Sequence, residues 1–241
     1  MTATTRILKN SFLLIFSQLL TKLFYFFTIA IITRLLGVED FGKYIFAFSF
    51  VSLFSVIAEL GINTLTIRDV ARKKEAAAQF FWNGLLLKLI LSAVMFVIIV
   101  IVVNLGNFTP LLKQIVYILT AGIILDGISA FAVAFYRAFE KMEYEAYLNV
   151  IDKLLLLGIA LLALLFNWKI IEYVYLLLAL AFVKMGISLL FLGGKIIPLT
   201  RLFRPQSSRE FCLLLLKNYW PFALMSLFGV IYFRIDTVIL E

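Results

Sequence analysis

Residues 11–33 read SFLLIFSQLLTKLFYFFTIAIIT, an apolar run with a single charge, Lys22. A helix needs about 20 mostly apolar residues to cross the hydrocarbon core of a bilayer. The run is too long for the apolar core of a signal peptide, which has about 7–15 residues, and no small-residue cleavage site follows it. The pattern therefore predicts a membrane-spanning helix that stays in the protein.

Six more stretches of the chain share this character. The seven candidate spans are residues 11–33, 44–66, 80–103, 115–136, 148–167, 171–192 and 219–240. The sequence of 241 residues is 64% hydrophobic and 15% charged, whereas soluble domains are about 45–50% apolar and about 25% charged. We therefore expect an all-α fold, a polytopic transmembrane helix bundle, and we exclude a soluble enzyme.

Several kinds of chemistry are excluded by what the sequence lacks. It has no histidine and one cysteine, Cys212, so neither a disulfide within the chain nor a thiolate metal cluster can form. The glycine-rich patterns that cradle nucleotide phosphates are missing as well. We expect no metal, no cofactor and no catalytic residues, so the protein is predicted not to be an enzyme.

The distribution of lysine and arginine between the spans predicts the orientation in the membrane. With the N-terminus inside, 13 of the 22 lysines and arginines lie in segments on the inner side and four on the outer side. Cytoplasmic segments of membrane proteins carry this excess. We therefore predict a multi-pass protein of the cell (plasma or inner) membrane with a cytoplasmic N-terminus. The net charge of +8 follows from this topology, and no nucleic-acid partner is expected.

A weak internal repeat divides the chain. The tripeptide Leu-Lys-Asn occurs at residues 8–10, before the first span, and at residues 216–218, before the seventh. Repeats of this kind form the two halves of some transporters. We predict a six-helix N-terminal lobe over residues 1–205, then a cytoplasmic connection and the first helix of a truncated second lobe over residues 206–241. A complete seven-span protein is the alternative.

Ionisable residues within the predicted spans are the main functional signal. Charged side chains are costly at bilayer depth and usually face a cavity or a partner. They are Lys22, Glu59, Asp126, Lys184, Arg234 and Asp236. On the first span, Gln18, Lys22 and Tyr25 recur at helical spacing and form a polar stripe. Similar stripes surround Glu59 and Asp126, which indicates a shared polar interior.

These groups suit binding rather than catalysis, because cations bind phosphate well and carboxylates can exchange a proton or a cation. The predicted substrate-binding residues are Lys22, Arg234, Gln18 and Tyr25. The predicted ion-coupling or cavity carboxylates are Glu59, Asp126 and Asp236.

A purely structural interpretation stays open at this point. Lys22 could pair with Asp126, and such a pair would only hold helices together. Lys88 and the adjacent Asp152 and Lys153 lie nearer the cytoplasmic ends of their spans, where long side chains can reach the interface. We expect these last three residues to have no role beyond that.

Four short segments stand at the ends of the predicted spans. Residues 34–44 read RLLGVEDFGKY, residues 59–71 ELGINTLTIRDVA, residues 136–142 YRAFEKM and residues 234–239 RIDTVI. Together they resemble the polysaccharide flippases, of O-antigen or teichoic acid type, of the multidrug/oligosaccharidyl-lipid/polysaccharide exporter superfamily. The first is similar to that family's R-x-L-G-P-x-x-F-G-x-Y, with Val38 in place of proline. Gly37 and Gly42 are predicted to permit the tight turn there.

The resemblance covers the whole chain but only the first half of the family's length. It implies two six-helix lobes around a cavity that opens alternately to the two sides. The implied cargo is an oligosaccharide on a polyprenyl pyrophosphate, and the implied partners include the missing C-terminal lobe, a polysaccharide polymerase and glycosyltransferases. The family's first and seventh helices line the cavity, so Lys22 and Arg234 become the candidates for contacting pyrophosphate.

Other functions compete with this one. A cation-coupled multidrug exporter or a peptidoglycan-precursor flippase would have the same overall architecture. A membrane-embedded glycosyltransferase would need a sizeable polar loop with paired carboxylates for acid–base work. The connections here are short, and we interpret Glu140, Glu143 and Glu145 as a solvated charge run.

Overall fold

The structure, a computed structural model, describes residues 3–197, with side chains from residue 15 onward. All the regular structure in this part of the chain is helical. The elements are α1 (Ala3–Glu59), α2 (Ile62–Arg72), a short 3-10 helix η1 (Lys74–Ala76), α3 (Ala77–Leu105), α4 (Pro110–Ala138), α5 (Met142–Leu165) and α6 (Ile170–Lys195). The predicted second part, residues 206–241 with the seventh span, lies outside the described residues.

Five helical segments within the described residues are long and apolar enough to cross a membrane. The predicted spans 80–103, 115–136 and 171–192 lie within α3, α4 and α6, and the span 148–167 ends two residues beyond α5. The six separate helices expected for this lobe are not found. The first two predicted spans instead form the two arms of α1, which meet at the non-helical Gly37, and the second span, 44–66, runs past the end of α1 into α2.

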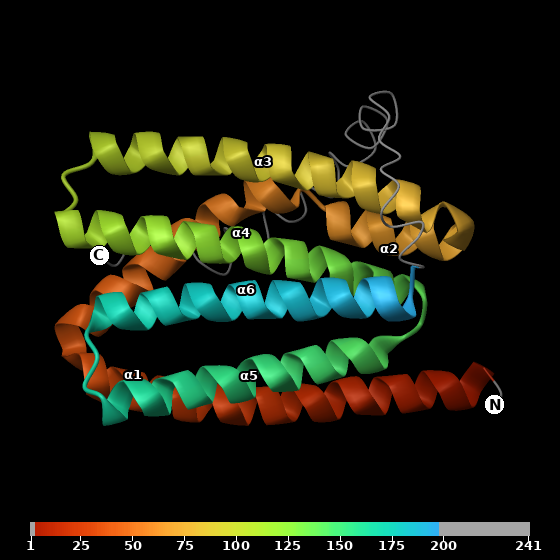
Figure 1. Cartoon of the computed structure of the whole chain (residues 1–241), viewed down its shortest axis with the longest axis horizontal. Helices are drawn as coiled ribbons and strands as arrows, with labels where there is room; N and C mark the ends of the chain where they lie inside the picture. Colours follow the sequence, from red (N-terminus) through yellow and green to blue (C-terminus); the bar gives the residue numbers. More distant parts are fainter. Residues whose placement is uncertain (1–2, 198–241) are drawn as a thin grey trace.

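A single glycine changes the direction of α1. Gly37 has φ 71° and ψ 177°, whereas the chain on both sides of it is helical. Only glycine adopts this backbone conformation readily. In Figure 1, α1 runs along the lower edge from the N-terminus, turns at the left and returns toward α2. The turn predicted at Gly37 is confirmed, whereas Gly42 lies within the second arm and has no left-handed conformation.

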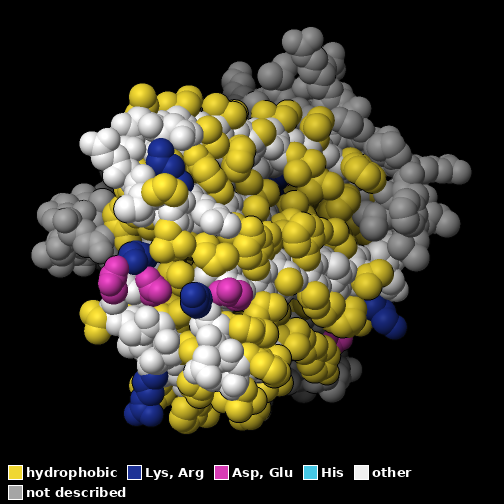
Figure 2. Space-filling model, turned by 60° about the vertical axis from the view of Figure 1, so that its left-hand side comes forward, with side chains coloured by type: hydrophobic (Ala, Val, Ile, Leu, Met, Phe, Trp, Pro, Cys, Tyr) yellow, Lys and Arg dark blue, Asp and Glu magenta, His cyan; other side chains and the backbone are white. Residues whose placement is uncertain are grey.

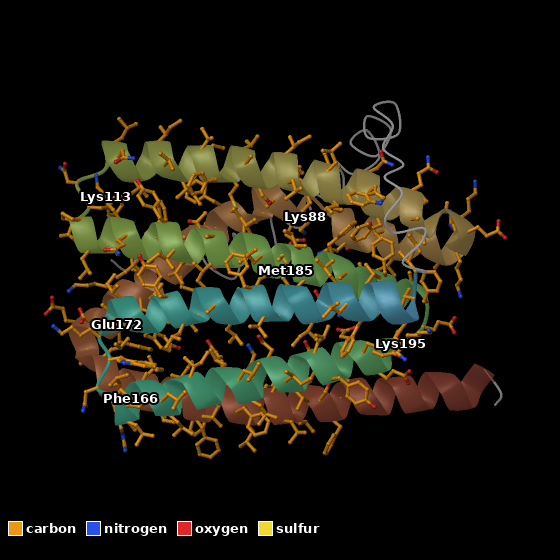
Figure 3. The ribbon with its side chains drawn as sticks, viewed as in Figure 1. Lys88, Lys113, Phe166, Glu172, Met185 and Lys195 are labelled. Carbon is orange, nitrogen blue, oxygen red and sulfur yellow. The ribbon has the colours of Figure 1, made fainter. Side chains whose placement is uncertain are left out.

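The helix connections gather at two ends of the bundle. Figure 1 places the turn of α1, the α3–α4 connection and the α5–α6 connection at the left, and the α2–α3 and α4–α5 connections at the right. Glu172 and Lys195 mark these ends in Figure 3, and we name them the Glu172 end and the Lys195 end. The predicted inner and outer segments thus separate to opposite ends, and a cytoplasmic Lys195 end remains a prediction.

Local sequence explains where helices begin and pack. Thr109 accepts a hydrogen bond from the backbone N–H of Leu112 (3.4 Å), and Pro110 fills the first position of α4.

Gly84 on α3 lets α4 approach closely, because a Cβ there would lie 2.5 Å from the ring of Phe131. The α4 and α6 helices are joined where the buried hydroxyl of Tyr136 donates to the backbone carbonyl of Ser188 on α6.

Much of the surface is apolar. Figure 2 shows hydrophobic side chains over much of the described face, with few charged groups, several of which gather in a row at the left of the view. On α3 the exposed side chains include Leu86, Leu89, Val94, Phe96, Val97 and Ile101. A helix that is apolar all round belongs in a protein core or in a bilayer. Because these residues face outward, the surface fits a lipid environment.

Candidate functional site

Four charged side chains meet between α4, α5 and α6. The ammonium of Lys184 on α6 lies 2.9 Å from a carboxylate oxygen of Asp126 on α4 and 3.7 Å from one of Asp152 on α5. The ammonium of Lys153 lies 3.0 Å from the second oxygen of Asp152. Met185, the neighbour of Lys184, lies midway between the two ends in Figure 3. We name these four residues the central charge network.

The network reaches α1 through an aromatic ring. The ammonium of Lys153 lies 5.7 Å from the ring centroid of Tyr25, a cation–π distance. Gln18 and Lys22 stand on the same arm of α1 and are exposed. Lys22 forms no ion pair within the described residues, and the alternative pairing of Lys22 with Asp126 is wrong because Asp126 pairs with Lys184.

A second ion pair is sealed between α1 and α3. The ammonium of Lys88 lies 2.9 Å from a carboxylate oxygen of Glu59, and Asn63 donates to the other oxygen (2.8 Å). The side chain of Lys88 is only 1% exposed, and that of Glu59 is 35% exposed. The expectation that Lys88 reaches the interface is therefore wrong. Its ammonium finds a carboxylate inside the bundle, which offsets part of the cost of burying the charge.

Glycine makes room for this sealed pair. A Cβ added at Gly127 on α4 would lie 3.1 Å from Cε of Lys88 and 3.6 Å from the Glu59 carboxylate. Asp126, one residue earlier, belongs to the central charge network. Consecutive residues of α4 thus face two separate ion pairs.

A third pair closes the α4–α5 connection at the Lys195 end. Arg137 holds Glu145 through two hydrogen bonds, Nε to Oε2 at 2.8 Å and a terminal nitrogen to Oε1 at 2.5 Å. This forked geometry is typical of strong arginine–carboxylate pairs. Glu145 is buried, so its interpretation as part of a solvated run is wrong.

Two cavities lie on either side of the Asp126–Lys184 pair. One, toward the Glu172 end, has a volume of about 190 Å³. Its lining includes Tyr25, Tyr44, Phe48, Asp152, Lys153 and Val174. The other, toward the Lys195 end, has a volume of about 320 Å³. Its lining includes Asn63, Ser129, Ala130, Arg137, Glu145 and Asn149. Asp126 and Lys184 are the residues that line both.

The predicted site residues are brought together only in part. Tyr25 and Asp126 line one cavity, whereas Glu59 belongs to the sealed pair. Arg234 and Asp236 lie outside the described residues. Asp152 and Lys153 were expected to reach the membrane interface. This expectation is wrong, because both line the cavity at mid-bundle. In the sequence, the charge of these two residues within a predicted span was the feature that could have indicated this position.

The site is suited to binding and to charge exchange. The described residues contain no cluster of three or more metal-ligating side chains. The central charge network holds two carboxylates and two ammonium groups, so its charges balance. A balanced set can rearrange without leaving a net charge in a medium of low polarity, provided that each charge keeps a partner.

Comparison with known proteins fits this architecture. Neither the curated proteins nor the solved structures contain a match to the chain. The family model described as polysaccharide biosynthesis protein matches residues 7–241, and the family includes flippase-type transporters. Taken with its span-forming helices, this match shows that the chain is a membrane protein and belongs to the polysaccharide biosynthesis protein family.

Proposed function

We propose that this protein flips a polyprenyl-pyrophosphate-linked oligosaccharide from the cytoplasmic to the outer leaflet, for the synthesis of cell-surface polysaccharide. The observation that carries the proposal is the family match over residues 7–241, on a bundle that holds charged groups midway along its helices. A cargo with a pyrophosphate and sugars needs cations and polar side chains at bilayer depth, where they are otherwise costly.

Lys22 is the described residue that we assign to the pyrophosphate. It is exposed on the first arm of α1, next to Gln18 and Tyr25 on the same stripe, and it has no carboxylate partner among the described residues. The lysines at positions 153 and 184 already pair with carboxylates. An ammonium without a partner is the better ligand for an incoming anion, because no ion pair must be broken first. We assign Arg234 the same role on sequence grounds.

The direction of transport follows from the proposed orientation. With a cytoplasmic N-terminus in the cell membrane, the Lys195 end faces the cytoplasm. The cargo would enter there and leave at the Glu172 end by alternating access, in which one site opens in turn to the two sides of the membrane. Asp126 and Asp236 would couple transport to an ion gradient, whereas Glu59 is held by Lys88 and Asn63. The enzymes that build and polymerise the oligosaccharide would be the partners.

The experiment is leaflet-resolved measurement of lipid-linked oligosaccharide in cells that lack the full-length gene. We expect accumulation in the cytoplasmic leaflet, relief by the parent protein, and at least tenfold weaker relief by Lys22→Ala with Arg234→Ala, because charge-assisted hydrogen bonds contribute about 1.5–3 kcal/mol each. Lys43→Ala is the matched control. Lys43 lies on the same helix but pairs with Glu39 and Asp40 near the Glu172 end, and it should complement fully.

Normal lipid-linked oligosaccharide in the deletion strain would contradict the flippase. Ion-driven efflux of cationic drugs would then support the multidrug exporter, and accumulation of a peptidoglycan precursor would support the related precursor flippase. Formation of glycosidic bonds by the purified protein would support a glycosyltransferase instead.

A further inference from the structure

The cavity toward the Lys195 end contains polar groups that the bundle itself does not use. The side-chain oxygen of Asn63 on α2 is buried and accepts no hydrogen bond from any described residue. Asn149 on α5 lines the same cavity, and its amide also has no partner in the described part of the chain. The hydroxyl of Ser129 on α4 donates to a backbone carbonyl of its own helix (3.1 Å) and can still accept. Because buried polar atoms are nearly always satisfied, this lining indicates an occupant that forms hydrogen bonds.

The charged groups of this cavity are already neutralised in pairs. Arg137 holds Glu145 through a forked pair of hydrogen bonds, and Lys184 pairs with Asp126. An anion would have to displace a carboxylate, and a cation would have to displace an ammonium or guanidinium group. Either exchange leaves a charge of the protein without its partner, at a cost in free energy. The lining therefore favours a neutral ligand over a phosphate, a metal ion or a cationic drug.

The unused hydrogen-bonding capacity is of a mixed kind that suits hydroxyl groups. The Asn63 oxygen can only accept, the Asn149 amide can donate and accept, and Arg137 has further N–H groups besides those bonded to Glu145. A hydroxyl group both donates and accepts, so neighbouring hydroxyls on one sugar ring can meet such a set together. Apolar side chains such as Val133 lie between these polar groups and offer a surface for the C–H face of the ring.

The size and position of the cavity suit a small part of the proposed cargo. Its volume of about 320 Å³ is near the lower end of the roughly 300–1,000 Å³ that is usual for ligand pockets. The lining residues of α4 run from Asp126 to Arg137, about 16 Å along the helix, from mid-bundle to the end at which we propose that the cargo enters. Tyr25, which shares a stripe with Lys22, lines the neighbouring cavity. A sugar in this cavity would therefore lie beside the site that we assign to the pyrophosphate.

We propose that this cavity is a binding site for a neutral sugar residue of the cargo, with Asn63, Asn149 and the Arg137–Glu145 pair as its hydrogen-bonding groups. The inference rests on the proposed flippase function and adds a contact that is separate from Lys22. The lysine binds the pyrophosphate, which is the same whatever sugars are attached, and the cavity recognises the sugar. Affinity for the lipid carrier and selectivity for its sugar thus belong to different parts of the chain.

The test uses a thiol reporter in the cavity of the purified full-length protein in lipid nanodiscs. Cys212→Ser removes the single cysteine of the sequence, and Ala130→Cys introduces the reporter at an exposed position of the lining. Val133→Cys is a second reporter in case the first variant folds poorly, and Ile123→Cys reports on the neighbouring cavity. The rate of labelling by a maleimide is measured with lipid-linked oligosaccharide extracted from the cells and, at the same concentration, with the bare polyprenyl pyrophosphate.

We expect the lipid-linked oligosaccharide to slow the labelling of Ala130→Cys by about tenfold or more, because a ligand in a pocket covers most of the surface that it contacts. The bare carrier should not slow it, and Ile123→Cys should be unaffected by either. Asn149→Leu keeps the size of the side chain without its hydrogen bonds, and it should raise the concentration for half protection by about fivefold or more. Asn104→Leu is the matched control, because Asn104 lies on α3 outside the cavity, and it should leave this concentration unchanged.

Equal protection by the bare carrier would overturn the sugar site, because the cavity would then hold pyrophosphate or lipid. Equal slowing of Ile123→Cys would overturn it as well, since it would report a change of shape rather than occupancy, and no protection at all would mean that the cavity holds only water. The flippase is tested separately by the leaflet measurement. Protection together with a normal leaflet distribution in the deletion strain would support the sugar site and contradict the flippase, and accumulation without protection would do the reverse.

Discussion

On one side of α4, Asp126 pairs with Lys184 where two cavities meet, and on the other side Gly127 leaves room for the pair between Glu59 and Lys88. The chemistry of the two pairs is the same, an ammonium 2.9 Å from a carboxylate oxygen. Their exposure differs: the side chains of Lys88 and Glu59 are 1% and 35% exposed, and those of Lys184 and Asp126 are 27% and 49% exposed.

The difference separates a structural ion pair from one that can change state. A sealed pair cannot be broken without leaving an uncompensated charge, which is strongly destabilising. A pair that water reaches loses much less when one partner is neutralised. Position in the sequence does not distinguish them, since both lie within predicted spans. The two pairs are distinguished by whether a cavity reaches them.

The largest expected effect comes from breaking the sealed pair on one side only. Glu59→Gln leaves the buried ammonium of Lys88 without a carboxylate, and it should reduce the free energy of unfolding by about 3–5 kcal/mol. The measurement is thermal or denaturant unfolding of the purified protein in one detergent. Adding Lys88→Met to this variant should restore most of the loss. A single variant as stable as the parent would show that the pair is not structural.

An intermediate effect is expected from filling space on the two sides of α4. Gly127→Leu would press on Lys88 and should cost about 1–3 kcal/mol of unfolding free energy, as overpacked cores do. Gly122→Leu is the matched control, because no atom lies within 4 Å of a Cβ at Gly122 and its side faces a cavity. Equal unfolding free energies for the two variants would contradict the assignment of sealed and open sides.

The smallest effect on stability is expected at Asp126, to which we assign a role in transport. Asp126→Asn should change the free energy of unfolding by less than about 1 kcal/mol, since Asp152 remains near Lys184 and the cavities admit water. The same unfolding assay measures it. A loss as large as that of Glu59→Gln would mean that the two pairs are equivalent, and the comparison would fail.

The helices could be predicted from the sequence because their signal is local. Apolar runs of about 20 residues located α3, α4 and α6 and the greater part of α5. The joining of the first two spans into α1 was missed, because residues 34–43 are polar enough to suggest a loop yet have helical backbone except at Gly37. Hydropathy indicates which segments partition into lipid and says little about whether a polar segment is helical.

The charge pairing could not be predicted in this way. Asp126 and Lys184 are 58 residues apart, and Glu59 and Lys88 are 29 apart. Which charges meet depends on the rotation of each helix about its own axis, and this is set by packing such as that of Gly84 against Phe131. The sequence therefore predicted Asp126 and Tyr25, which line one cavity, but it could not identify Lys184 as the partner of Asp126.

Gly37 also decides the parity of the membrane crossings. A straight helix of the 57 residues of α1 would be about 85 Å long, nearly three times the thickness of the hydrocarbon core. The turn at Gly37 divides it into two arms that can each cross once. If that turn were lost, one crossing would disappear, and every later segment would exchange sides, including the lysines and arginines of the Lys195 end. The backbone conformation of Gly37 thereby determines on which side of the membrane each later connection lies.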